Sequence, residues 1–122
     1  MNKISLKHFV IFSLILFVLV IISCPNKTNY GQKNAAATQV KVKDILSKKY
    51  IGQEVKLEGR ITLECGAGCW FYLEDETGTI YVDLGPSNFA IPQLVGRSVV
   101  VNGQAIEKDG QIKMIGKGVN LK

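Results

Sequence analysis

Residues 54–84 decide the fold, and they read EVKLEGRITLECGAGCWFYLEDETGTIYVDL. From Glu54 to Cys65, apolar and polar side chains alternate with a period of two, which predicts a half-buried β-strand. The apolar side chains that we expect to face a core are Val55, Leu57, Ile61 and Leu63. Gly59, in the middle of this strand, indicates a bend or bulge, as a small barrel needs at a corner.

Two shorter strands are expected next, over Cys69–Glu74 and Thr79–Leu84. The turn between them is Asp75-Glu76-Thr77-Gly78, where Gly78 can take a positive φ angle. The alternation places five apolar side chains inward: Phe71, Leu73, Ile80, Val82 and Leu84. It places three aromatic side chains outward: Trp70, Tyr72 and Tyr81.

The remaining sequence supplies the other elements of a barrel. Gly85–Gly96 holds two prolines and breaks the sheet, and Arg97–Ile106 and Gln111–Leu121 read as the fourth and fifth strands. Upstream, Val42–Lys48 is expected to form a short helix or turn, with an apolar face made of Val40, Val42, Ile45 and Leu46. Five strands with a crossing segment after the third predict an all-β fold, a five-stranded OB-type Greek-key barrel with a short N-terminal helix.

Three stretches resemble the anticodon-binding type of OB domain: Val55–Gly59, Phe71–Val82 and Gly96–Gly103. They share three sequence motifs with that family: G-x-[I/V], L-x-D-x-T-G-x-I and G-x-x-V-x-V-x-G. Most of these positions face inward or lie in turns, so the resemblance implies the fold more than a ligand. Binding of single-stranded nucleic acid, the commonest use of this domain type, is the function that it offers as a candidate.

The start of the chain reads as an export signal. Lys3 and Lys7 precede Phe9–Ile22, an uncharged run of 14 residues. A bilayer span needs about 20 residues, so this run suits the core of a signal peptide instead. The run leads into Ile21-Ile22-Ser23-Cys24, which resembles a bacterial lipobox and implies that Cys24 is lipidated and becomes the mature N-terminus.

These features predict three regions: a lipoprotein signal peptide over 1–23, a lipid anchor and flexible tether over 24–39, and an OB-fold domain over 40–122. The alternatives to lipidation are an uncleaved signal anchor and a cleaved signal peptide that ends at an unmodified Cys24 by chance. In every case the domain is expected outside the cytoplasm. Lipidation places it in the cell envelope, anchored to the membrane and facing the periplasm or the extracellular side.

Cys65 and Cys69 flank Gly66-Ala67-Gly68, where the first two strands meet. With Cys24 acylated, an even number of cysteines remains, and facing strand positions come close to the spacing that a disulfide needs. The alternatives are a Cu(I) or zinc site completed by Glu64 or Asp75, a redox-active dithiol, and two free thiols. Gly68-Cys69-Trp70 also resembles a family of small exported OB-like proteins of unknown function, which implies location and fold but no activity.

Trp70, Tyr72 and Tyr81, with Arg60 beside them, form a candidate ligand face on the strands where OB folds hold oligonucleotides or sugars. Packing of the rings under a neighbouring segment is the structural alternative. From Glu54 onward the chain has seven basic and nine acidic residues, a balance of −2. This balance opposes tight binding of phosphate backbones.

The preferred hypothesis is therefore a monomeric, non-catalytic binding or adaptor module for an envelope protein, a sugar or a small ligand, without a cofactor. The only histidine, His8, lies in the expected signal peptide, which argues against an enzyme. Binding of single-stranded nucleic acid is the first alternative, and metal or haem handling through Cys65 and Cys69 is the lesser one.

Overall fold

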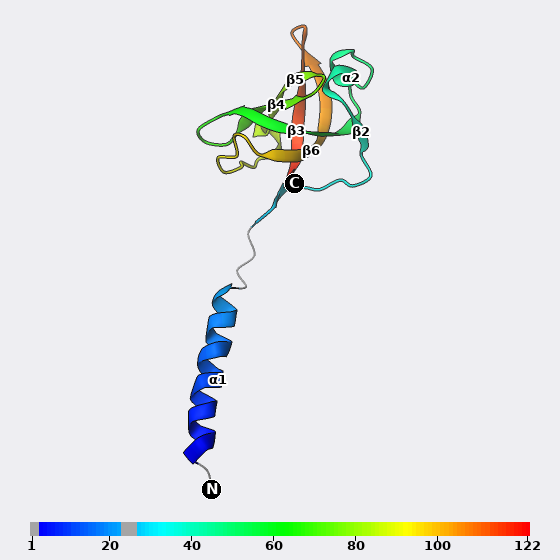
Figure 1. Ribbon diagram of the computed structural model, residues 1–122. Helices are drawn as coiled ribbons and strands as arrows, with labels where there is room; N and C mark the ends of the chain where they lie inside the picture. The colour runs from blue at the N-terminus through cyan, green and yellow to red at the C-terminus, as the bar shows by residue number, and fades with distance from the viewer. Residues whose placement is uncertain (1–2, 23–26) are drawn as a thin grey trace.

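The computed structural model describes residues 3–22 and 27–122. Its elements, in chain order, are α1 (Lys3–Ile22), β1 (Asn29–Gly31), β2 (Thr38–Val40), α2 (Val42–Leu46), β3 (Glu54–Glu64), β4 (Trp70–Asp75), β5 (Gly78–Asp83), a short 3-10 helix η1 (Gly85–Ser87), β6 (Ser98–Lys108) and β7 (Gln111–Leu121). Figure 1 shows the strands curled around one interior, with the turn between β6 and β7 projecting at the top.

Five of the strands close into a barrel. β4 pairs antiparallel with both β3 and β5, β5 pairs parallel with β7, and β6 pairs antiparallel with both β7 and β3. This cycle confirms the predicted five-stranded OB-type barrel. The lead-in segment agrees with the short helix or turn expected over Val42–Lys48: α2 ends at Leu46, and a turn in which Lys48 takes a φ of 69° follows it.

The segment expected to be a flexible tether, residues 24–39, contains β1 and the first two residues of β2 in its described part. β1 pairs antiparallel with β7 at Gly118–Asn120, and β2 pairs parallel with β3 at Val55–Leu57. β4 pairs with β3 only from Arg60 onward, so β2 occupies the edge of β3 that β4 leaves open. The physical reason for this difference is that exposed strand edges carry unpaired backbone groups, which these short strands satisfy.

A bulge in β3 changes which side chains face the core. The register between β3 and β4 shifts between Ile61 and Leu63, which reverses the alternation for the rest of the strand. Ile61 is buried, whereas Leu63 is 54% exposed. The inward position predicted for Leu63 is therefore wrong, and Glu64, expected outward, is turned toward the interior beside Phe71 instead.

The core confirms the inward pattern elsewhere. Its buried members from the barrel include Val55, Leu57, Ile61, Phe71, Leu73, Ile80, Val82, Leu84, Val99, Val101, Ala105, Met114 and Val119. α2 adds Val42 and Ile45, while Leu46 is 42% exposed and does not join the apolar face that the sequence predicted. α2 packs on β5, so it covers the end of the barrel beside the β4–β5 turn.

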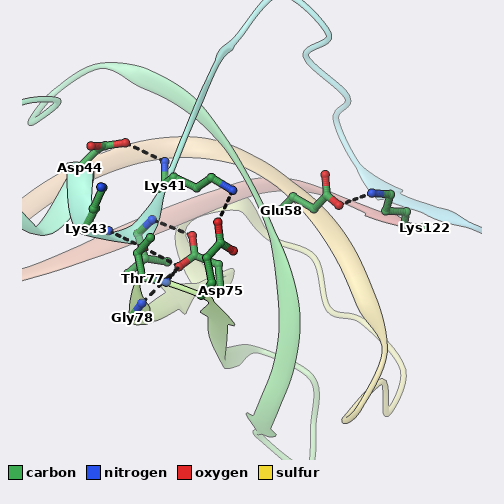
Figure 2. A network of polar contacts seen from close by, with 10 residues as sticks. Lys41, Lys43, Asp44, Glu58, Asp75, Thr77, Gly78 and Lys122 are labelled. Carbon is green, nitrogen blue, oxygen red and sulfur yellow. Dashed lines mark hydrogen bonds and ion pairs between the residues drawn. The ribbon is translucent and has the colours of Figure 1, made fainter.

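Asp75 fastens α2 to the β4–β5 turn, as Figure 2 shows. Its carboxylate accepts a hydrogen bond from the Val42 amide at 2.9 Å and others from the Thr77 amide and hydroxyl at 2.7 and 2.6 Å. The Thr77 hydroxyl in turn accepts from the Lys43 amide at 3.0 Å. The first N–H groups of a helix have no partner inside it, so the turn caps α2 from another part of the chain.

The same contacts set the acidity of Asp75. Burial is the largest single influence and opposes ionisation, but the hydrogen bonds from Thr77, Val42 and Gly78 together outweigh it and lower the pKa below its ordinary value. A carboxyl group with a lowered pKa stabilises the fold above its unfolded-state pKa of 3.8, and that contribution is lost as the pH falls through the folded-state value.

The N-terminal helix α1 carries exposed apolar side chains along its described part, among them Phe9, Phe12 and Leu14. Taking the described residues alone, none of the helices combines the length and the apolar character that crossing a membrane requires. Ser23 and Cys24, which the signal-peptide and lipidation predictions need, lie outside the described residues.

Replacing Asp75 with alanine should lower the free energy of unfolding by about 1–2 kcal/mol, because the cap on α2 and its buried partners lose their acceptor. Glu76→Ala is the matched control, since it removes only the exposed ion pair with Lys41 and should leave the stability nearly unchanged. Urea unfolding at neutral pH measures both. The difference between the parent and D75A should shrink as the pH falls from 3.8 through the lowered folded-state pKa of Asp75, and equal losses for the two variants at neutral pH would contradict the capping role.

Candidate functional site

Trp70, Tyr72 and Tyr81 gather on the outer surface of β4 and β5, and we call these three side chains the aromatic face. Tyr72 lies directly opposite Tyr81 in the β4–β5 register, and Trp70 lies opposite Asp83. The residues that alternate with them, Phe71, Leu73, Ile80 and Val82, are buried. The outward placement expected from the sequence is therefore the one observed.

The three rings contact one another as a compact cluster. The ring centroids of Trp70 and Tyr72 are 6.0 Å apart and those of Tyr72 and Tyr81 are 5.5 Å apart, both pairs edge to face. Trp70 and Tyr81 lie 5.7 Å apart with planes tilted by 32°. Such pairs stabilise one another by about 0.5–1.5 kcal/mol each, which favours one mutual arrangement of the rings.

The surroundings of the aromatic face combine apolar and charged groups. Leu63 pairs with Tyr72 from β3, so the bulge adds an exposed aliphatic side chain to the face. The Lys113 ammonium lies 5.9 Å from the Tyr81 ring centroid and 3.3 Å from the Asp83 carboxylate. Burial and the charge of Asp83 raise the pKa of the Tyr81 hydroxyl, so at neutral pH it remains a hydrogen-bond donor.

Arg60 lies beyond the aromatic face, toward α2. It pairs with Glu74, the next outward position of β4 after Tyr72, and it is exposed. Arg60 lines a cleft of about 410 Å³. The other charged or hydroxyl-bearing residues that line it are four carboxylates, one lysine and one serine: Glu58, Glu74, Asp75, Glu76, Lys41 and Ser98. The structure thus places Arg60 on the same strands as the rings but in mainly acidic surroundings.

Cys65 and Cys69 lie at the opposite end of the aromatic face, in the loop that joins β3 to β4. The Gly68 amide donates to the Cys65 carbonyl at 2.8 Å, and the Cys65 amide donates to the Trp70 carbonyl at 3.0 Å. Both cysteines are free thiols, and their sulfurs are 3.0 Å apart. The sulfurs are in contact without a covalent bond, so the predicted disulfide stays a prediction.

The structure does not bring together the side chains that the sequence suggested as ligands of a metal ion. Asp75, one of the two carboxylates considered as an extra ligand, lies at the far end of β4 and holds α2. Glu64, the other, accepts from the Leu94 amide at 3.1 Å under the loop that follows β5. Within the described part of the chain, no three histidine, cysteine, aspartate or glutamate side chains are grouped as a metal ion would need.

The two thiols differ in acidity. The hydrogen bond from the Cys69 thiol is the largest influence on Cys65, and together with amides of the same loop it lowers the pKa of Cys65. The same hydrogen bond, helped by burial, raises the pKa of Cys69. Cys65 is therefore the sulfur that carries the negative charge when the pair loses its first proton.

The 65–69 loop is held from one side by the segment between η1 and β6. The Ile91 amide donates to the Gly68 carbonyl at 3.0 Å, and the Gln93 side chain donates to the carbonyls of Cys65 and Gly66 at 3.1 and 3.2 Å. Gly68 is buried with a φ of +73°, and the Ile91 carbonyl occupies the space that a β-carbon would need. Only glycine fits there, which no pattern in the sequence indicates.

Gly68→Ala should lower the free energy of unfolding by about 2 kcal/mol or more, because an L side chain at this φ is strained and collides with the Ile91 carbonyl. Gly66→Ala in the same loop is the matched control: Gly66 has open space around it and should accept alanine with a change of at most about 0.5 kcal/mol. Thermal and urea unfolding of both variants measure this, and equal stabilities would refute the close contact.

The sequence matches no protein-family model and no curated protein. Among solved structures, the fold is similar to that of the hypothetical protein ygiW from E. coli, with a TM-score of 0.59 and 17% identity over 76% of this chain and 99% of that one. It is also similar to a putative aspartyl-tRNA synthetase from Leishmania major, with a TM-score of 0.56 and 11% identity over 79% of this chain and 23% of the synthetase. At these identities the likenesses support the OB-like fold alone.

Proposed function

We propose that this protein is a membrane-anchored, extracytoplasmic binding module that holds its ligand on the aromatic face. The observation that carries the proposal is the cluster of Trp70, Tyr72 and Tyr81, which is fixed by ring contacts yet only half-buried. Aromatic rings that remain partly open to solvent offer flat apolar surface with polar tips, as ligand sites commonly do. The OB-type fold presents this surface on the strands that most often bind ligands.

The groups around the rings favour a neutral, hydroxyl-rich ligand such as a sugar. Asp83 and Glu74 flank the rings along β5 and β4, and carboxylates accept hydrogen bonds from hydroxyl groups. The Tyr81 hydroxyl and the Lys113 ammonium supply donors. A sugar ring can thus stack on an aromatic ring while its hydroxyls reach both kinds of partner.

Single-stranded nucleic acid is the second candidate. The same rings can stack bases, at about 1–3 kcal/mol per base, and Arg60 and Lys113 can meet phosphates. The electrostatics oppose this reading, because Lys113 is already paired with Asp83 and Arg60 shares its cleft with four carboxylates. A phosphate backbone laid across β4 and β5 would meet these negative charges.

The anchoring part of the proposal rests on the sequence. Lys3 and Lys7 before an apolar run, followed by Ser23-Cys24, are the features of a lipoprotein signal peptide. Lipid chains on Cys24 would hold the barrel at the membrane surface. We propose a non-catalytic role for this surface, since the aromatic face and the carboxylates and lysine beside it provide no pairing of a nucleophile with a base.

Trp70 is the only tryptophan of the chain, so ligands of the aromatic face should change its fluorescence. We expect saturable changes with neutral oligosaccharides of bacterial envelope glycans and weaker or no changes with single-stranded DNA at equal concentration. Tyr72→Ala should weaken sugar binding about tenfold or more, the equivalent of losing one stacked ring. Tyr30→Ala on β1 is the control and should leave the affinity unchanged.

Each outcome of this titration decides between the candidates. Binding of DNA but not of sugars, lost in Y72A, would favour the nucleic-acid alternative. Equal affinities of Y72A and Y30A for sugar would place the site elsewhere. Absence of any saturable change with both ligand classes would overturn the binding role of the face.

The anchor is tested separately by expressing the full chain in a bacterium and measuring the mass of the mature N-terminal peptide. We expect cleavage before Cys24 and the added mass of lipid chains, and recovery of the protein with the membrane fraction. Cys24→Ser should abolish the modification, because the thiol is the attachment point. An unmodified Cys24 in the parent would refute lipidation.

A further inference from the structure

We propose that Cys65 and Cys69 form a thiol–disulfide exchange site, which reduces a disulfide-bearing partner and closes into a disulfide across its own loop. The inference is independent of the ligand proposed for the aromatic face. It starts from the approach of the two sulfurs, 3.0 Å apart in a hydrogen bond. Both cysteines are half-buried, so a partner can reach them from solvent.

Closing the disulfide needs only a small movement. Bonded sulfurs lie about 2.05 Å apart, so the two sulfurs must approach by about 1 Å. Hydrogen bonds already hold the loop in the conformation that brings the sulfurs together: the Gly68 amide donates to the Cys65 carbonyl, and the Gln93 side chain donates to the carbonyls of Cys65 and Gly66. The loop therefore loses little conformational freedom when the bond forms.

The hydrogen bonding assigns the roles of the two thiols. Cys65 accepts from the Cys69 thiol and from amides of the loop, which favours its thiolate, the form that attacks a disulfide. Cys69 keeps its proton at first, because it is the donor in the pair. Cys65 is thus the attacking thiol and Cys69 the resolving one.

The exchange proceeds in two balanced steps. The Cys65 thiolate attacks one sulfur of the partner's disulfide, forms a mixed disulfide and releases the partner's other sulfur as a thiolate, which takes up a proton. Cys69 then loses its proton and attacks the Cys65 sulfur, which releases the partner's second sulfur as a thiol. Two cysteine thiols of this chain are oxidised to one disulfide, and one disulfide of the partner is reduced to two thiols.

The test uses the full chain carrying Cys24→Ser, so that only the loop thiols remain. The reduced protein is mixed with glutathione disulfide as the probe, quenched with iodoacetamide at intervals and analysed by mass spectrometry. We expect loss of two hydrogens from the loop peptide without a lasting glutathione adduct. The fluorescence of Trp70, which follows Cys69 directly, should change with the same time course.

Single-thiol variants test the assigned order. With Cys69→Ser the glutathione adduct on Cys65 should accumulate, and it should form faster than the adduct on Cys69 forms with Cys65→Ser. The loop amides still lower the pKa of Cys65 in the first variant, whereas burial and the charge of Asp83 still raise the pKa of Cys69 in the second. Gly66→Ala, which keeps both thiols, is the loop control and should react like its parent. Urea unfolding of each variant verifies that it is folded before its rates are compared.

Two results would overturn the proposal. The first concerns the parent protein under conditions in which the Cys69→Ser variant reacts with glutathione disulfide. The proposal fails if both parent thiols are still alkylated by iodoacetamide, or if the parent accumulates the glutathione adduct. The other is an equal rate of adduct formation in the two single-thiol variants, which would remove the distinction between attacking and resolving thiols.

Discussion

The bend of β3 is the constraint on which the rest of the structure depends. Along Glu54–Arg60 this strand pairs with β6, and from Arg60 to Glu64 it pairs with β4, so one strand serves two sides of the barrel. A side chain at Gly59 would collide with the Glu74 carbonyl, which is why the crossing point carries a glycine. The bulge that follows completes the turn and reverses the facing of the last residues.

The bulge also shapes both ends of the candidate site. By turning Leu63 outward it extends the aromatic face, and by turning Glu64 inward it gives the loop after β5 an acceptor for the Leu94 amide. The second oxygen of Glu64 is buried without a partner, and burial raises the pKa of this carboxyl group. The fold therefore tolerates the free-energy cost of one unpaired carboxylate oxygen at the point where Glu64 binds the loop after β5.

The sequence predicted most of the barrel because its strands follow a plain period of two, bounded by glycine, proline and acidic turns. It also predicted the outward side of Trp70, Tyr72 and Tyr81, since no bulge interrupts β4 or β5. The bulge in β3 was not predicted, because the residue types of Ile61-Thr62-Leu63 continue the alternation of apolar and polar residues while the backbone register shifts there. β1 and β2 were not predicted either, because three residues are too few to show a period, and their pairing depends on edges that exist only in the folded barrel.

The pairing of β1 would have a mechanical consequence if the N-terminus is anchored as proposed above. Tension applied there would act first on three residues of β1 and on the bonds around them, from Leu121 to Thr28, from Gln32 to Lys117 and from Asn102 to Gln32. These few bonds can break while the buried side chains of the five barrel strands keep their mutual contacts, and Tyr30, which packs against the core, would leave it. Each freed residue would lengthen the segment between the proposed anchor and the barrel by roughly 3.3–3.6 Å, so an anchored barrel could reach farther from the membrane without unfolding.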